Sequence, residues 1–267
     1  MIFTYFLLFI LGLVTGSFLN VIIYREIADQ KKSKYLPSWL TGRSYCDHCR
    51  KKISWYDNIP LVSYLVLGGM CRYCHKKISR QYPLVELLTA FEFIWLYWLL
   101  GRFSFFGRLE GFYSASLLLY WLFMFSSLLV IFLVDAKIGI IPDWVIIPGI
   151  IISSLRLIES GRWQFFLAGL AAGVFFLTLY LITSAKGLGF GDVKLGFLMG
   201  LFLGYPAILV AILLAFLTGA FFSVMLILSG KKHWGQTIAF GPFLVVGTII
   251  AKLWGIYMWQ WYVSLLI

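Results

Sequence analysis

Long apolar stretches follow one another along this chain, and most charged residues lie between them. The stretches cover residues 1–24, 84–100, 111–134, 138–155, 163–185, 195–230 and 236–267. A helix of about 20 apolar residues crosses a bilayer, so each stretch predicts at least one membrane-spanning helix. Residues 195–230 are too many for one crossing, and the turn-forming sequence Gly204-Tyr205-Pro206 divides them. The pattern therefore predicts about eight transmembrane helices.

The composition excludes an ordinary soluble domain. Of the 267 residues, 61% are hydrophobic and only 12% are charged, which is typical of a polytopic membrane protein. Residues 1–24 lack the basic start and the small-residue cleavage site of a secretory signal, so we interpret them as a retained span. We expect an all-α polytopic membrane fold.

The distribution of Lys and Arg predicts the orientation in the membrane. An even number of crossings leaves both termini on one side, and the loops on the other side carry most basic residues, above all residues 25–80. Because basic loops stay in the cytoplasm, we expect both termini outside and this long loop inside. The same bias, with attraction to anionic lipid headgroups, explains the net charge of +11 without a nucleic-acid partner.

All four cysteines fall in the long polar loop. Cys46 and Cys49 form one C-x2-C pair, and Cys71 and Cys74 form another. Two such pairs suit tetrahedral Zn2+, because each supplies two corners of the tetrahedron from one tight turn. Two disulfides are the alternative, although the reducing cytoplasm disfavours them.

A bound metal also explains how so short a loop folds. A segment below about 60 residues buries little apolar surface, and a structural metal supplies the missing stability. We therefore divide the chain into a first transmembrane helix at 1–24, a cytoplasmic zinc-binding loop domain with the four cysteines at 25–82 and a seven-helix transmembrane domain at 83–267.

Two aspartates lie at the cytoplasmic ends of predicted spans. Asp135 ends the apolar run 128–134, and Asp192 follows Gly189-Phe190-Gly191. Two crossings separate the aspartates, so both lie on the same side of the membrane. The span after Asp192 has only about 13 residues before the break at Tyr205, which places Asp192 deep in the protein.

Small residues predict which way Asp192 faces. Asp192, Gly196, Gly200 and Gly204 repeat every fourth residue and form one stripe along a helix. Because small residues let helices approach closely in lipid, we expect Asp192 to point toward a neighbouring helix.

The paired carboxylates favour acid–base hydrolysis. Two nearby carboxylates in a low-dielectric site share one proton, so one draws a proton from water while the other polarises an amide carbonyl. The alternatives are helix capping for Asp192 and a surface charge for Asp135. Asp143 follows Pro142 at a helix start and is interpreted as a cap.

Other polar or small residues within the spans have structural interpretations. Asn20 is expected to form an interhelical hydrogen bond, and Gly12 and Gly16 are expected to serve helix packing. Glu86 and Glu92 are expected to face the bundle interior, since charged groups avoid lipid.

These residues, taken in order, make the chain similar to the type IV prepilin peptidases, which are G-x-G-D intramembrane aspartyl proteases. The resemblance rests on Gly16-Ser17-Phe18-Leu19-Asn20-Val21 with Arg25, the four-cysteine loop, Asp57-Asn58-Ile59-Pro60, Gly69 with Cys71, Tyr82-Pro83-Leu84-Val85-Glu86, Asp135 with Ile141-Pro142-Asp143, residues 187–194 and Phe240-Gly241-Pro242.

The resemblance implies a bifunctional enzyme of the bacterial inner membrane. Asp135 and Asp192 would cleave the short basic leader of prepilin or pseudopilin substrates at the cytoplasmic membrane face. The cytoplasmic loop would then methylate the new N-terminal amine with S-adenosylmethionine, and Gly69 matches a position associated with methyl transfer. Glu86, near the cytoplasmic boundary, is expected either to assist methyl transfer or to pair with an Arg or Lys of the loop. Neither the substrate's identity nor the oligomeric state follows from the sequence.

Two other functions are compatible with parts of the pattern. One is a membrane methyltransferase in which the aspartates are only structural. The other is an ion-coupled transporter with a zinc sensor domain, although its acidic residues would be expected near the bilayer midplane.

Overall fold

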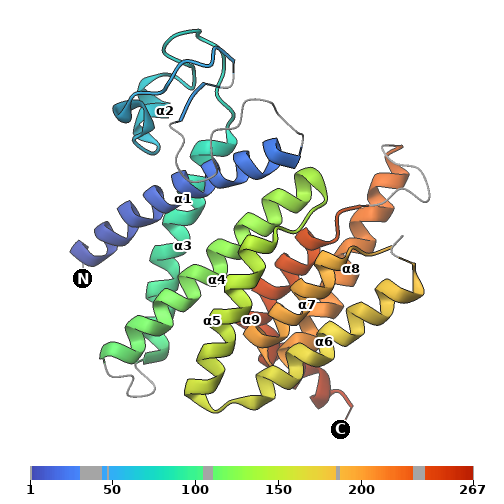
Figure 1. Ribbon diagram of the computed structural model, residues 1–267. Helices are drawn as coiled ribbons and strands as arrows, with labels where there is room; N and C mark the ends of the chain where they lie inside the picture. Colours follow the sequence, from blue (N-terminus) through green and yellow to red (C-terminus); the bar gives the residue numbers. More distant parts are fainter. Residues whose placement is uncertain are drawn as a thin grey trace. The chain divides into compact units, whose positions relative to one another are not determined.

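The computed structural model describes residues 2–30, 44–46, 48–104, 111–184, 187–230 and 238–266. In these residues the chain is almost entirely helical (Figure 1). The helices are α1 (Ile2–Gln30), η1 (Trp55–Asn58), α2 (Val62–Val66), α3 (Gln81–Ser104), α4 (Gly111–Ile138), α5 (Asp143–Ser160), α6 (Trp163–Ile182), α7 (Phe190–Leu203), α8 (Ala207–Leu228) and α9 (Gly241–Ser264). The chain divides into two compact units, Met1–Ser126 and Ser127–Ile267, and the boundary falls inside α4.

The predicted all-helical multi-pass membrane fold is confirmed. Helices lie in all eight of the expected places among the described residues, but not all of them are long enough to span a bilayer. Among the described residues, six helices are long and apolar enough to cross a bilayer: α1, α3, α4, α6, α8 and α9. The other two fall short of a full span, because α7 has only 14 residues and the 18-residue α5 carries Asp143, Arg156 and Glu159.

Predicted helix boundaries were wrong in two places. The first helix was expected to end at residue 24, but α1 continues to Gln30. The apolar stretch 138–155 was expected to be one span, but α4 continues to Ile138 and α5 begins only at Asp143. Gly139 turns the chain with a φ of 67°, and Pro142 caps α5 in an extended conformation. The predicted break at 204–206 is confirmed, since α7 ends at Leu203 and α8 begins at Ala207.

In the first unit, α1 and α3 pack closely along each other, with the cysteine loop and α2 at one end (Figure 1). A Cβ atom at Gly12 would lie 2.5 Å from the Ala90 Cα, and one at Gly16 would lie 2.7 Å from the Glu86 Cα. These glycines therefore permit backbone contact, as their spacing predicted. Asn20 makes the expected interhelical hydrogen bond, donating from its amide nitrogen to the Tyr82 carbonyl oxygen at 3.0 Å.

In the second unit, α7 is enclosed by its neighbours and packs most closely on α6. A Cβ atom at Gly200 would lie 2.4 Å from the Gly169 Cα, and one at Gly196 would lie 2.3 Å from the Phe176 ring. The predicted glycine stripe is therefore the surface that α7 presents to α6.

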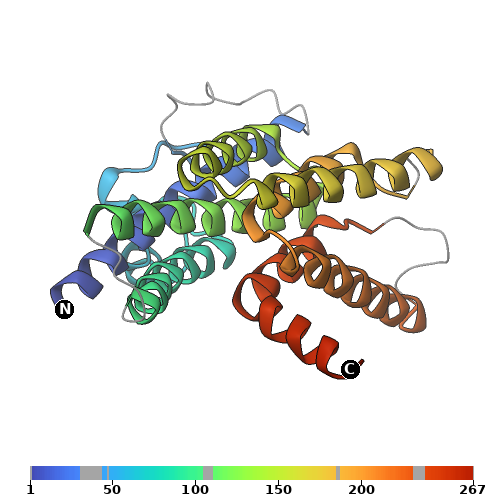
Figure 2. The ribbon, with the colours of Figure 1, turned by 90° about the horizontal axis from the view of Figure 1, so that it is seen from below.

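The last two helices, α8 and α9, lie side by side (orange and red in Figure 2). Their contact is close at Gly247, where a Cβ atom would lie 2.5 Å from the Ala211 carbonyl oxygen. On α9, Lys252 donates to the Phe202 carbonyl oxygen at 2.8 Å and lies over the Phe202 ring. A cation at this position satisfies a carbonyl at the carboxyl end of α7, where the helix dipole favours positive charge.

Candidate functional site

Both predicted aspartates belong to the second unit and are buried there. Asp135 lies in the last turn of α4 and is 4% exposed, and Asp192 lies in the first turn of α7 and is 7% exposed. The two carboxylates lie close enough for their charges to repel each other. Asp135 is therefore not a surface charge, and the two acidic groups occupy one buried region.

The environments of the two carboxylates differ. Asp192 Oδ2 accepts a hydrogen bond from the Gly189 backbone N–H at 2.9 Å, which is the contact expected of a helix cap. The Gly241 backbone faces Asp135, yet Asp135 Oδ2 is buried without a hydrogen bond of ordinary geometry to the described residues. Buried polar atoms normally have a partner, so this oxygen is available to a substrate or a water molecule.

Three close contacts hold this region together. A Cβ atom at Gly191 would lie 3.0 Å from the Ile141 Cβ, so the start of α7 rests on the segment that follows Asp135. A Cβ atom at Gly241 would lie 2.6 Å from Asp135 Oδ2, which brings the start of α9 against the carboxylate. Phe240 anchors that start through its ring contact with Phe216, at a centroid distance of 5.1 Å.

An ion pair that sequence reasoning missed also joins these segments. Lys194 Nζ lies 2.7 Å and 2.9 Å from the two Asp143 carboxylate oxygens. The pair connects the first turn of α7 to the first turn of α5. Asp143 does occupy the helix start, as predicted, but its partner is 51 residues away and no local spacing indicates it.

The four cysteines of the loop form one cluster in the first unit. Their Sγ atoms all lie within 4.8 Å of one another, and those of Cys46 and Cys74 are 3.8 Å apart. Tetrahedral zinc with Zn–S bonds of about 2.3 Å separates its ligands by about 3.8 Å. A disulfide needs about 2.05 Å between sulfurs, and all four cysteines are free. The donor set therefore fits a tetrahedral metal ion and not two disulfides.

The two halves of the cluster share one local design. In each half the backbone N–H four residues after the first cysteine donates to that cysteine's carbonyl oxygen, from Arg50 to Cys46 and from His75 to Cys71. The backbone N–H groups of Cys74 and Tyr73 lower the pKa of the Cys71 thiol to about 7. Burial raises the pKa of the Cys46 thiol to about 11. A divalent cation would stabilise both thiolates, since metal ligation requires the deprotonated sulfur.

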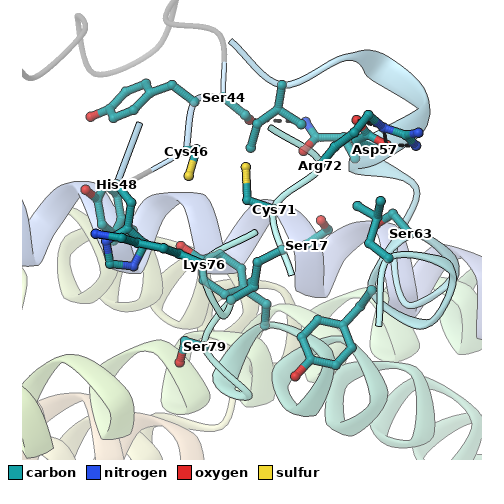
Figure 3. A pocket seen from close by; sticks show the side chains of 18 of the residues that line it. Ser17, Ser44, Cys46, His48, Asp57, Ser63, Cys71, Arg72, Lys76 and Ser79 are labelled. Atoms are coloured by element: carbon teal, nitrogen blue, oxygen red, sulfur yellow. Dashed lines mark hydrogen bonds and ion pairs between the residues drawn. The ribbon is translucent and has the colours of Figure 1, made fainter. Parts of the chain in front are cut away.

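A cavity of about 420 Å³ lies between the cysteine loop and the ends of α1 and α3 (Figure 3). Glu86 on α3 lines it and accepts a hydrogen bond from the Leu61 backbone N–H at 2.8 Å. Gly69 does not line the cavity itself but lies against Tyr64, which does. Gly69 has a φ of 70°, and a Cβ atom there would lie 2.9 Å from the Tyr64 hydroxyl oxygen. The structure thus brings Glu86 and Tyr64 to one cavity and gives Gly69 a supporting position.

Comparison with known proteins matches the two halves of the chain separately. Residues 10–100 match the bacterial peptidase A24 N-terminal domain, and residues 122–224 match the type IV leader peptidase family. No solved structure matches the chain.

Curated relatives cover nearly the whole chain. A protein of Aeromonas hydrophila is 34% identical over 97% of this chain and 93% of its own length. One of Pseudomonas aeruginosa is 34% identical over 92% and 89%, and one of Legionella pneumophila is 30% identical over 98% and 95%. All three carry the name prepilin leader peptidase/N-methyltransferase. The chain therefore belongs to the type IV leader peptidase family.

Proposed function

We propose that this protein cleaves the leader of prepilin-like substrates at Asp135 and Asp192 and then methylates the new N-terminal amine. The main observation in support of the peptidase activity is the burial of two interacting carboxylates. One oxygen of this pair, Asp135 Oδ2, has no hydrogen bond of ordinary geometry to the described residues. Full-length similarity to proteins named for both activities supports the pair of functions.

The aspartates act as one acid–base unit in the cleavage step. The ionised carboxylate takes a proton from water, and the resulting hydroxide adds to the scissile carbonyl carbon while the protonated carboxyl donates to the carbonyl oxygen. The tetrahedral carbon then expels the amine, which leaves with a proton returned by the pair. Burial strengthens each of these interactions because the local dielectric is low.

The cysteine loop and its surroundings carry the methylation. Cys46, Cys49, Cys71 and Cys74 hold zinc in a structural role, since four protein ligands leave no open position on the metal. S-adenosylmethionine supplies a methyl group on a sulfonium centre. Glu86 accepts the proton of the substrate ammonium, and Gly69 keeps Tyr64 in place.

The placement in the cell follows from charge and family. The protein lies in the bacterial inner membrane with both termini outside and the four-cysteine loop in the cytoplasm. Its functional parts are the first transmembrane helix α1, the four-cysteine loop together with the start of α3, and the peptidase helices of Ser127–Ile267. The partners are prepilin or pseudopilin helices held in the lipid bilayer, so membrane partition supplies much of the substrate binding.

Mass spectrometry of a prepilin incubated with purified protein, with and without S-adenosylmethionine, tests both activities. The wild type is expected to shorten the substrate and to add one methyl group only with the donor. Asp135→Asn and Asp192→Asn should yield no cleaved product, whereas Glu159→Gln, an exposed acid of the same unit, should cleave normally. Efficient cleavage by either Asn variant would reduce the aspartates to a structural role and leave methylation as the activity.

A further inference from the structure

We propose that the cavity between the cysteine loop and the ends of α1 and α3 is where the methyl donor binds and where methyl transfer occurs. This inference rests on the proposed methyltransferase activity and gives it a location. The donor site is then formed by the cysteine loop together with the membrane helices α1 and α3, and not by the loop alone.

The cavity has the size and construction of a small-molecule site. Its volume of about 420 Å³ lies in the usual range of roughly 300–1,000 Å³ for ligand pockets. The membrane helices supply Ser17, Val21 and Arg25 from α1 and Tyr82 and Glu86 from α3. The loop supplies the remaining wall, including both cysteine turns. Figure 3 shows Ser17 and Cys71 among the lining residues that it labels.

The charges of the lining match a ligand with separated positive and negative groups. Lys76 and Lys77 offer cations to a carboxylate, and Glu86 offers a carboxylate to a sulfonium or an amine. S-adenosylmethionine carries an amino-acid carboxylate and a sulfonium on one molecule. A site with only one sign of charge would not match both groups.

Aromatic rings of the lining suit the remaining part of the donor. Tyr45, Tyr64, Tyr73 and Tyr82 all line the cavity. Arg50 already lies over the Tyr45 ring and Lys51 over the Tyr73 ring, at 5.4 Å and 5.0 Å from the ring centroids. The rings of Tyr64 and Tyr82 can stack on an adenine or attract a cationic sulfur. Arg72 is already held by Asp57, with Nη2 2.6 Å from Oδ1, so this ion pair stiffens the wall.

The position of Glu86 connects the cavity with a membrane-bound substrate. Glu86 is 6% exposed and lies in the second turn of α3, a helix long and apolar enough to span the bilayer. The Leu61 N–H bond and the nearby Ser17 hydroxyl orient its carboxylate. A pilin helix in the bilayer can therefore present its N-terminal amine at the level of Glu86.

The transfer step balances with these groups. Glu86 takes a proton from the substrate ammonium, which frees the nitrogen lone pair. The nitrogen then forms a bond to the methyl carbon while the carbon–sulfur bond breaks and its electron pair stays on sulfur. The donor leaves as a neutral thioether, the methylated amine is cationic, and Glu86 returns its proton to water.

Binding of labelled S-adenosylmethionine to the purified full-length protein tests the location. Ser63 lines the cavity on α2, so Ser63→Phe places a ring inside it. Val62, the preceding residue, is 53% exposed and does not line the cavity, so Val62→Phe is the matched control. Equilibrium dialysis should show a dissociation constant raised about tenfold or more for Ser63→Phe and unchanged for Val62→Phe.

Two further readouts keep the result interpretable. Zinc content and prepilin cleavage should stay normal in Ser63→Phe, which shows that the protein is folded. If that variant loses zinc, photocrosslinking of labelled donor to the wild type replaces it, and the label must map to residues that line the cavity. If the zinc-loaded Ser63→Phe variant binds the donor with wild-type affinity, or if the crosslinked label maps to residues outside the cavity, the proposed location is wrong. Both activities are unaffected by that result. Wild-type protein that cleaves prepilin but binds no donor overturns methyl transfer itself.

Discussion

At the scale of single residues, Gly241 leaves the space that the Asp135 carboxylate occupies. A Cβ atom there would lie 2.6 Å from Asp135 Oδ2 and 2.9 Å from its Cγ, so Gly241→Ala must displace the carboxylate. Misplacement of a catalytic group by about 1 Å costs roughly 100-fold in rate. We expect a loss of that order in kcat/KM for prepilin cleavage, with the protein still folded.

Gly101→Ala is the control for this change, because nothing lies within 4 Å of a Cβ atom at Gly101 on α3. It should cleave at the wild-type rate and be slightly more stable, since alanine favours helix. Normal cleavage by Gly241→Ala would show that Asp135 can move without loss and would count against its catalytic role.

The Lys194–Asp143 ion pair gives a second prediction at this scale. Its side chains are 31% and 56% exposed, so it adds little to stability. Its value lies in fixing the start of α7, two residues from Asp192. Lys194→Ala and Asp143→Ala should each lower kcat about tenfold, and the double variant should lose little more, because coupled residues are non-additive. Kinetics of the three variants measure this coupling, and fully additive losses would refute it.

Residue types and spacing predicted much of the site, but not its contacts. The four cysteines and both aspartates are recognisable because such residues are costly or reactive where they stand. The Lys194–Asp143 pair and the Gly241 contact join residues far apart in the chain. Only the packing of α4, α5, α7 and α9 brings them together, and no periodicity within one helix encodes that packing.

At the scale of helices, the contact of α7 with α6 depends on atoms that cannot move aside. A Cβ atom at Gly200 would lie 2.4 Å from the Gly169 Cα and 2.5 Å from the Ala168 carbonyl oxygen, both of them backbone. Gly200→Ala must therefore separate the helices, and overpacking of this kind costs about 1–3 kcal/mol. We expect a lower Tm in detergent and reduced cleavage.

Gly173 on α6 provides the matched comparison, because a Cβ atom there would lie 3.4 Å from the Phe197 Cβ, an ordinary contact. Gly173→Ala should keep or raise the Tm, since alanine is about 1 kcal/mol better than glycine within a helix. Equal thermal shifts for the two variants would show that helix propensity, and not the close approach, controls stability here.

Apolar patterning predicted the helices better than their ends. The turn between α4 and α5 contains Ile140 and Ile141, whose hydrophobicity hid it inside an apolar stretch. Gly139 and Pro142 were the available signals, and both act on the backbone without changing hydropathy. The short α7 was predictable because Asp192 lies in its first turn and Pro206 follows its end. Its 14 residues extend only about 21 Å, less than a bilayer core of about 30 Å.

At the scale of the whole molecule, the two proposed activities fall in different compact units. Cys46, Cys71 and Glu86 belong to Met1–Ser126, whereas Asp135 and Asp192 belong to Ser127–Ile267. The two family matches, residues 10–100 and 122–224, divide the chain at nearly the same place as the two compact units. Loss of the metal should therefore abolish one activity and spare the other.

The cysteine loop has only Cys46 and Cys71 buried among its described residues 44–46 and 48–80, apart from Gly69, so it contains almost no apolar core to hold it without zinc. A chelator should make this loop sensitive to protease while α3 and α4 stay protected. Donor binding and methylation should fall with the zinc content and return when zinc is added back, and Cys46→Ser should not recover. Prepilin cleavage should persist throughout, because the aspartates are held by α4, α7 and the start of α9. A parallel fall in cleavage would mean that the peptidase unit needs the zinc loop for its own fold, and the two activities would then have to be treated as one site.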